Sequence, residues 1–348
     1  MSGGVDSSAA AYLMQQAGCD CAGAMMKLYA GEDGENAPPG RTCCSLADAQ
    51  DARSVAARLG MPFYVFNYTA DFEREVIKRF CGEYLSGRTP NPCIDCNRFM
   101  KFNLLLRRAR LMGCSFLASG HYARVEQSGG RYLLRKAIDS GKDQSYVLYM
   151  LTQEQLAALR FPLGGMTKHE VRELAASLGF WNAEKPDSQD ICFVPDGDYG
   201  AFLERRNALG NSAGDFVDSS GNALGRHKGH FYYTVGQRKG LGLAFDSPRY
   251  VLSKNPAANT VTLGKREELL RRECTLTDIN LIAADSIEQP LRVSVRTRYR
   301  QKEVPGTVVQ TAPDTLHIVF DEPQTAIAPG QAAVIYDGDY VVGGGTIC

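Results

Sequence analysis

The segment that most constrains the fold of this chain is its beginning, residues 2–8, with the sequence SGGVDSS. Gly3 and Gly4 let backbone N–H groups approach a ligand closely, because glycine adopts φ values that other residues resist. The alanine-rich run at residues 9–14 predicts a helix that ends near Gly18. Exposed N–H groups at the start of a helix bind anions, most often phosphate. The segment is neither a Walker loop nor a GxGxxG motif.

Predicted strands and helices alternate after this segment. Strands are predicted at residues 20–29 and 62–68, helices at 45–59 and 70–86, and a loop at 30–44. This alternation is typical of a doubly wound parallel sheet, which binds ligands at the carboxyl ends of its strands. From about residue 213 onward, short glycine-rich segments predict two β modules. We therefore expect an α/β domain followed by two smaller β-rich domains.

Local signals place further elements in the first 200 residues. A helix is predicted at about 99–112, after a proline-containing turn at 87–98. Residues 123–136 predict a hairpin around Gly129 and Gly130. Thr167 and Glu170 have the spacing of a capping box for a helix that runs to Gly179.

The composition is that of a globular protein of two or three domains: 348 residues, 44% hydrophobic and 22% charged. No apolar run approaches the roughly 18 residues that cross a membrane. The N-terminus is polar and does not look like a signal peptide. We therefore expect a cytoplasmic protein that does not bind a membrane. Because the formal net charge is zero, a nucleic-acid partner would have to be bound by local basic patches.

Three of the eleven cysteines are candidates for chemistry, and all three stand in predicted loops. Cys93 and Cys96 lie in the turn before the helix at 99–112, whose dipole and nearby cations would lower a thiol pKa. Cys192 lies in a polar loop at 181–198. An odd number of cysteines in a long chain argues against a secreted disulfide framework, and no second Cys-x-x-Cys completes a zinc site. A phosphate loop with loop thiols suggests ATP activation followed by sulfur transfer.

A ladder of cations is predicted near the C-terminus. Side chains of a strand alternate between its two faces, so Val293 and Val295 would face a core. The five cations at even positions would share the opposite face: Arg292, Arg296, Arg298, Arg300 and Lys302. The simplest interpretation is a solvated barrel face, but clustered cations without an intervening acid indicate contact with a phosphate backbone. A second basic, glycine-rich stretch spans residues 226–240.

Several stretches together resemble one family. The opening segment resembles the SGGxDS loop of the ATP-pyrophosphatase superfamily. Further matches follow in order along nearly the whole chain: GRTPNPCIDCNR, ASGHY, KDQSY, DSQDICF, GQRKGLG, VRTRYRQ and FDEPQTAIAPGQ. Together they resemble the bacterial tRNA-specific 2-thiouridylases. The resemblance implies an ATP-pyrophosphatase domain (1–198), a small central tRNA-binding domain (199–272) and a C-terminal tRNA-binding β-barrel (273–348).

The resemblance also implies roles for individual residues. ATP would bind at Met1, Ser2, Gly3, Gly4, Val5, Asp6, Ser7, Ser8, Met26 and Gly120. The target base would lie at Asn91, Pro92 and Cys93, and tRNA would contact His121, Lys142, Asp143, Gln144, Arg298, Tyr299 and Gln331. Cys192 would carry a persulfide, with Cys96 as its disulfide partner. Well-known members have Asp at the position of Cys93, a proposed acid/base site, so the proton-transfer role there is open.

By this resemblance, ATP and Mg²⁺ activate the wobble uridine of lysine, glutamate and glutamine tRNAs. The uridine O2 would attack the α-phosphate, and the Cys192 persulfide would deliver sulfur to C2 of the flipped base. The implied partners are tRNA and a persulfide donor, such as a cysteine desulfurase or a sulfur-relay protein.

Three alternatives stay open. Cys93, Cys96 and Cys192 could ligate a [4Fe–4S] cluster with one open iron. An amide-forming ATP-pyrophosphatase would need an ammonia source, and the sequence has no N-terminal cysteine nucleophile or glutaminase segment. A non-catalytic tRNA-binding protein is the third alternative. The pyrophosphate loop normally follows a buried strand and this chain begins at the loop, so we expect that strand to be missing.

Overall fold

The computed structural model describes residues 1–29, 46–185, 191–207, 209, 212–325 and 327–348, so the loop expected at 30–44 lies outside the described residues. The chain forms two compact units. The first unit consists of Met1–Ile77, Pro92–Gly197 and Asp339–Val341, and the second of Lys78–Asn91, Asp198–Gly338 and Val342–Cys348.

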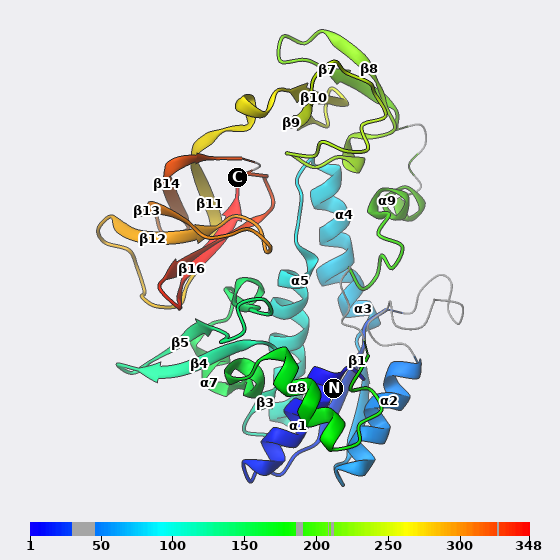
Figure 1. Ribbon diagram of the computed structural model, residues 1–348, viewed down its shortest axis with the longest axis vertical. Helices are drawn as coiled ribbons and strands as arrows, with labels where there is room; N and C mark the ends of the chain where they lie inside the picture. The colour runs from blue at the N-terminus through cyan, green and yellow to red at the C-terminus, as the bar shows by residue number, and fades with distance from the viewer. Residues whose placement is uncertain (30–45, 186–190, 208, 210–211, 326) are drawn as a thin grey trace. The chain divides into compact units, whose positions relative to one another are not determined.

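The first unit has the expected α/β character. Strand β1 (Gly23–Lys27) pairs in parallel with β2 (Phe63–Asn67), and β3 (Leu117–Ala118) pairs in parallel with β6 (Leu159–Arg160). Within the described residues these strands form two separate two-stranded sheets. Helix α1 (Val5–Gln16) follows the opening loop, and α2 (Leu46–Arg58) connects β1 to β2 (Figure 1). The strands and helices predicted before residue 68 are therefore confirmed, with ends shifted by one to four residues.

One apolar cluster lies directly beneath the opening loop. Helix α1 contributes Val5, Ala9 and Ala10, and α8 (Lys168–Ser177) contributes Val171 and Ala175. Each of these five side chains is at most 2% exposed. Because small side chains let the two helices approach closely, the start of α1 is anchored in a packed core.

Two longer helical segments differ from the sequence prediction. The helix expected at 70–86 runs through α3 (Thr69–Phe72), the π-helix η1 (Glu73–Ile77) and α4 (Lys78–Leu85). The turn expected at 87–98 was predicted wrongly in its second half. Helix α5 (Pro92–Asp95) begins there and continues through the π-helix η2 (Cys96–Leu105) into α6 (Leu106–Leu111). Proline fits the first helical position because its φ is already helical and its missing N–H has no helical partner there.

The predicted hairpin and capping box are both confirmed. Strands β4 (Ala123–Ser128) and β5 (Arg131–Lys136) pair antiparallel around Gly129 and Gly130, which both have positive φ. Thr167 and Glu170 exchange the two hydrogen bonds of a capping box at the start of α8. Shorter helices complete this unit: η3 (Ser145–Leu148), α7 (Gln153–Ala158) and η4 (Pro162–Gly165).

The second unit contains the two predicted β modules. In the first, β8 (Ala223–His227), β7 (Gly214–Val217), β10 (Thr260–Gly264) and β9 (Tyr250–Asn255) form a sheet in that order. Its core includes Phe216, Val251 and Val261, all fully buried. Helices α4 and α9 (Tyr199–Asn207) belong to the same unit, with Tyr84 and Tyr199 4.9 Å apart between ring centroids. The short 3₁₀ helices are η5 (His230–Tyr232) and η6 (Arg266–Leu269).

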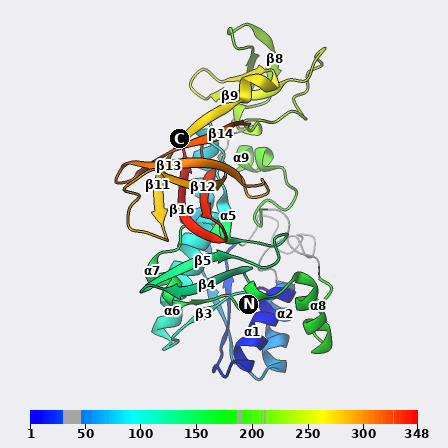
Figure 2. The same cartoon turned by 60° about the vertical axis from the view of Figure 1, so that its left-hand side comes forward.

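The second β module is a six-stranded barrel (Figure 2). Its strand order is β11 (Arg271–Leu281), β14 (Thr315–Gln324), β13 (Val304–Ala312), β12 (Leu291–Arg296), β15 (Ala332–Asp337) and β16 (Tyr340–Ile347). Pairing of β11 with β16 closes it. Closure removes free edges, and alternate side chains fill the interior. Val293 and Val295 face that interior, as predicted.

Among the described residues, none of the helices combines the length and apolar character needed to cross a lipid bilayer.

Candidate active site

The opening loop is closed by its own serines. The Ser2 backbone N–H donates to Ser7 Oγ at 3.0 Å, and the Ser7 and Ser8 hydroxyls both donate to the Gly4 carbonyl, at 3.0 and 3.1 Å. Gly4 is the residue before the first turn of α1, and Gly3 has a φ of +74°. The sequence prediction of a glycine turn at a helix start is therefore confirmed. Such a turn presents N–H groups to an anion.

Two glycines let this loop pack against its neighbours. A Cβ on Gly3 would lie 2.5 Å from the Asp48 carbonyl oxygen of α2. A Cβ on Gly120, just after β3, would lie 2.7 Å from the Asp6 carbonyl carbon. The Asp48 carbonyl cannot move aside without displacing α2, and the Asp6 carbonyl cannot move without displacing the loop. The structure thus places Gly120 against the loop, and Met26 is buried near the carboxyl end of β1.

The carboxylate of Asp6 is held by two residues that sequence reasoning missed. Lys168 Nζ lies 2.8 Å from both Asp6 oxygens, and the Tyr122 hydroxyl donates to Asp6 Oδ1 at 2.8 Å. The Lys168 side chain is only 9% exposed. Lys168 is the first residue of α8, so the capping box at Thr167 fixes where its side chain starts. The sequence signal for Lys168 was its place directly after a capping residue. Its partner Asp6 was not predicted, because it lies 162 positions away in the sequence.

The three candidate thiols all belong to the first unit. Cys93 is exposed in the first turn of α5, and Cys96 is 9% exposed at the start of η2. Cys192 is partly exposed and precedes Phe193, which is 2% exposed and packs edge-on against Phe72 with ring centroids 5.7 Å apart. In the described part of the chain, no three His, Cys, Asp or Glu side chains are grouped to hold a metal ion.

The turn before Asn91 and Pro92 is held from several sides within the second unit. Thr89 N–H donates to the Pro329 carbonyl at 2.8 Å, and Gln331 Nε2 donates to the Thr89 carbonyl at 2.8 Å. Lys254 Nζ lies 3.4 Å from the Arg88 carbonyl oxygen. The structure thus places Gln331, a predicted tRNA contact, on the backbone that leads to the predicted target-base residues.

Three other predicted tRNA contacts are engaged inside the first unit. His121 is 8% exposed, its Nδ1 lies 2.8 Å from Ser119 Oγ, and burial together with Lys101 holds its pKa well below the usual value. The Asp143 carboxylate accepts hydrogen bonds from the backbone of Ala137 and Ser145 and from the Ser145 hydroxyl. Gln144 Oε1 accepts from the Tyr122 N–H at 3.0 Å. Lys142, beside them, is partly exposed.

The predicted ladder of five cations is wrong. Strand β12 ends at Arg296, so the last three cations lie in a turn. Arg292 makes two 2.7 Å bonds to the Asp321 carboxylate of β14, and Arg296 pairs with Glu303 at 2.9 Å. Both acids lie outside β12, in β14 and directly before β13, so the sequence of β12 alone does not contain them.

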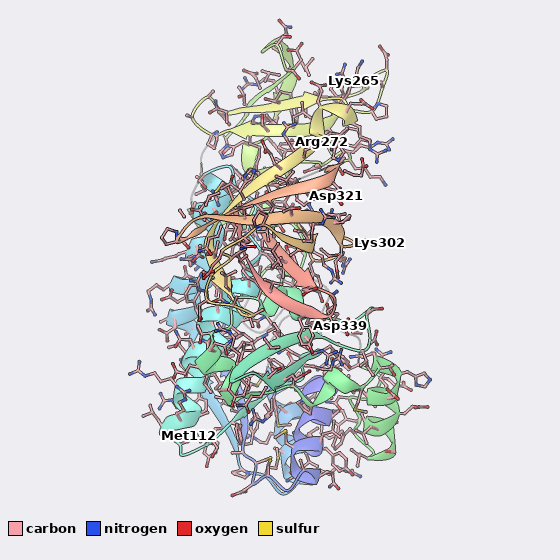
Figure 3. All side chains as sticks on the ribbon, turned by 90° about the vertical axis from the view of Figure 1, so that its left-hand side faces the viewer. Met112, Lys265, Arg272, Lys302, Asp321 and Asp339 are labelled. Carbon is pink, nitrogen blue, oxygen red and sulfur yellow. The ribbon has the colours of Figure 1, made fainter. Side chains whose placement is uncertain are left out.

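A short exposed part of this basic segment is nevertheless present. Arg298 Nη2 donates to the Val235 carbonyl at 2.7 Å, while Tyr299, Arg300 and Lys302 have exposed side chains. Lys302 extends from the barrel surface, where Arg272 and Asp321 mark the neighbouring strands β11 and β14 (Figure 3). The surface available to a polyanion is therefore the turn at 299–302 and not a strand face.

The two halves of the basic stretch at 226–240, in the middle module, also have different surroundings. Arg226 pairs with Asp215 at 2.9 Å, and His227 is buried. Arg238 and Gly240, by contrast, line a pocket of about 390 Å³ together with Phe245 and Arg249. The second half of the stretch is therefore the half that borders a pocket.

Comparison with known proteins gives matches along the whole chain. Three family models match: the tRNA methyl transferase HUP domain at residues 1–196, the tRNA methyl transferase PRC-barrel domain at 201–265, and the aminomethyltransferase beta-barrel domain at 271–347. A tRNA-specific 2-thiouridylase of Clostridioides difficile is 50% identical over 349 residues, covering 100% of this chain and 96% of the relative. Those of Acetivibrio thermocellus and Geobacter metallireducens are 48% and 49% identical, again over 100% of this chain and over 97% and 95% of the relatives.

The order of the matches also follows the architecture. The HUP-domain match contains the opening loop and all three candidate thiols, and the beta-barrel match coincides with β11–β16. These relatives are matched over the whole chain, so the matched region covers the loop, the thiol segments and both β modules. The chain therefore belongs to the tRNA-specific 2-thiouridylase family.

Proposed function

We propose that this chain is an ATP-dependent enzyme that replaces O2 of the wobble uridine of tRNA by sulfur. The observation that carries the proposal is the closed loop at Ser2–Ser8, packed against Gly120 in the same unit as Cys96 and Cys192. Membership of the 2-thiouridylase family supports the same reaction. The substrate set implied by the resemblance is the lysine, glutamate and glutamine tRNAs.

In the first step, the loop N–H groups hold the phosphates of ATP. The uridine O2 attacks the α-phosphorus, and the bond from that phosphorus to pyrophosphate breaks. Asp6 is a partly exposed carboxylate within the loop and suits Mg²⁺, which takes one or two carboxylates together with phosphate oxygens. Bound there, Mg²⁺ would neutralise phosphate charge. Lys168 and Tyr122 keep the Asp6 carboxylate in place.

In the second step, the terminal sulfur of a Cys192 persulfide attacks C2, and AMP leaves with the former O2. The Cys96 thiolate then attacks Cys192 Sγ, the S–S bond breaks, and the sulfur stays on C2. The product disulfide joins Cys96 and Cys192, and a dithiol reductant must open it before the next turnover. A persulfide-donor protein, such as a cysteine desulfurase or a sulfur-relay protein, would reload Cys192.

The alternative in which Cys93, Cys96 and Cys192 hold a [4Fe–4S] cluster requires the three thiols to converge. Because the described residues contain no such group, we derive no step through a cluster. Iron and sulfide analysis after anaerobic purification tests it. A Cys93→Asp variant sharpens the test: activity without bound iron supports the persulfide route, and joint loss of iron and activity supports the cluster.

The direct test uses undermodified tRNA, ATP, Mg²⁺ and a persulfide donor. We expect 2-thiouridine, AMP and pyrophosphate in equal amounts. Cys192→Ser should abolish 2-thiouridine while ATP binding persists, because the hydroxyl cannot carry a persulfide. Full thiolation by that variant would contradict the persulfide role, and thiolation without ATP consumption would contradict activation by adenylation.

A further inference from the structure

The segment that leads to Cys192 is attached to the ATP loop by one buried amide. Asn182 is 2% exposed, and its Nδ2 donates to the Gly3 carbonyl and to Ser8 Oγ, both at 3.0 Å. A carbonyl oxygen can only accept, so the amide must present its nitrogen to Gly3. Asn182 therefore contacts both the turn and the first helical residues of the loop.

The other half of the same amide lacks a partner. Among the described residues, nothing donates a hydrogen bond to the buried Oδ1 of Asn182. An unsatisfied buried acceptor is costly, so the hydrogen bonds seen around Asn182 leave one favourable bond unmade. A small rearrangement of the loop or of this segment can bring a donor to Asn182 Oδ1. The contacts of Asn182 are therefore suited to change when phosphate binds to the loop.

Ionic contacts join the same segment to helix α2. Lys185 Nζ lies 2.7 Å from Asp48 Oδ1 and 2.8 Å from Asp51 Oδ2, and the Trp181 ring nitrogen donates to Asp51 Oδ1 at 3.0 Å. Asp48 is 5% exposed, and its backbone is the surface on which Gly3 packs. The loop, α2 and residues 181–185 thus contact one another pairwise, and a shift of one affects the other two.

We infer that Asn182 is a positioning residue that couples occupancy of the ATP loop to the placement of Cys192, ten residues later. This inference rests on the proposed function, in which Cys192 acts only after the base is adenylated. Phosphate bound by the loop backbone changes the surroundings of the Gly3 carbonyl, and Asn182 transmits that change to the cysteine segment. Coupling between two sites is reciprocal, and typical values correspond to about 5- to 150-fold changes.

The experiment measures how fast iodoacetamide alkylates Cys192 in the full chain, using the mass of the peptide that contains it. Rates are compared with and without a non-hydrolysable ATP analogue and Mg²⁺. For the unaltered chain we expect the nucleotide to change the rate at least about 5-fold. Asn182→Ala should still bind the analogue, with a Kd within about 10-fold, and its rate ratio should fall to about one.

Asn97→Ala is the matched control. Asn97 is also a buried amide, 3% exposed, with an unpartnered Oδ1 among the described residues, but its Nδ2 donates to the Val147 carbonyl at 3.0 Å. That variant should keep the nucleotide effect. If Asn182→Ala fails to fold, Lys185→Met tests the same coupling through α2 and should reduce the rate ratio.

The outcomes separate this inference from the proposed function. If the unaltered chain thiolates tRNA and binds the analogue, but the analogue does not change the alkylation rate of Cys192, the coupling alone is overturned. A full nucleotide effect in Asn182→Ala and Lys185→Met overturns it as well. Complete loss of analogue binding in Asn182→Ala makes Asn182 a nucleotide-binding residue instead. An unaltered chain that neither binds the analogue nor thiolates tRNA overturns the proposed function and the coupling with it.

Discussion

The opening loop at Ser2–Ser8, where we propose that ATP binds, and the basic turn of the barrel are built in different ways. Around the loop, backbone packs on backbone: Gly3 lies against Asp48, and Gly120 lies against Asp6. In the barrel, Arg292 and Arg296 are paired with acids, and the exposed residues are confined to the turn at 299–302. A reaction centre depends on single close contacts, whereas a surface that meets a polyanion adds many weak ones.

The largest effect is expected from Gly120→Ala. A methyl group 2.7 Å from the Asp6 carbonyl carbon must displace the loop backbone. A displacement of about 1 Å at a reaction centre costs on the order of 100-fold in rate. ATP-dependent 2-thiouridine formation and analogue affinity measure the loss. Gly82→Ala in α4, where a Cβ meets nothing within 4 Å, is the control and should leave both unchanged. Near-normal activity of Gly120→Ala would show that the loop does not depend on single close contacts.

Lys254 tests whether the second unit also contains a site that depends on single contacts. Burial lowers the pKa of its ammonium to about 8, below the roughly 10.4 of an exposed lysine. The unfolded chain therefore binds more protons between these pH values, and the free energy of unfolding rises as the pH rises from about 8 to about 10.4.

Lys254→Met should remove this rise, and the variant should be more stable than the unaltered chain below pH 8, by up to about 3 kcal/mol. Urea denaturation at pH 7, 8, 9 and 10 measures it. Lys265→Met, an exposed lysine of the same module, is the control. Identical pH dependence in the Lys254 variant and the unaltered chain would show that Lys254 is not the responsible group.

Lys168→Met tests whether the ion pair between Lys168 and Asp6 supports nucleotide binding by the loop. Without the ammonium, the Asp6 carboxylate keeps only the Tyr122 bond among those that hold it here. A hydrogen bond to a charged group contributes about 1.5–3 kcal/mol, so we expect the affinity for the ATP analogue to fall about 10-fold or more. Titration calorimetry measures this loss. Lys168→Arg keeps the charge and should recover part of the affinity; an unchanged Kd for Lys168→Met would contradict the role given to this pair.

The smallest effect should come from the barrel. Arg300→Ala should weaken tRNA binding by about 3- to 10-fold and reduce the slope of log K against log salt by about one. Arg292→Ala should leave tRNA affinity within about 2-fold, because the two Arg292–Asp321 bonds already engage that guanidinium. Filter binding at several salt concentrations measures both. Equal losses of tRNA affinity in the two variants would support the predicted ladder and contradict the distinction between the turn and the strand face.

Features that depend on neighbours along the chain were predicted from the sequence. The glycine turn before α1, the hairpin at Gly129 and Gly130, the Thr167–Glu170 capping box and the alternation of Val293 and Val295 were all found where expected. Each is fixed by φ preferences, by hydrogen bonds over three or four residues, or by the period of two in a strand. The helix that begins at Pro92 was missed, although proline at the first helical position was a local signal.

The tertiary structure decided which distant residues meet. Lys168 reaches Asp6 across 162 positions, Asn182 reaches Gly3 across 179, and Gln331 reaches Thr89 across 242. No local spacing encodes these pairs, because they form only where packed helices and closed sheets bring separate segments within hydrogen-bond distance. The sequence by itself therefore determined the glycine turn before α1, the order of the elements and the family resemblance. The balance of charge at Asp6, the pairing of Arg292 and the link from the loop to the Cys192 segment depended on packing between segments.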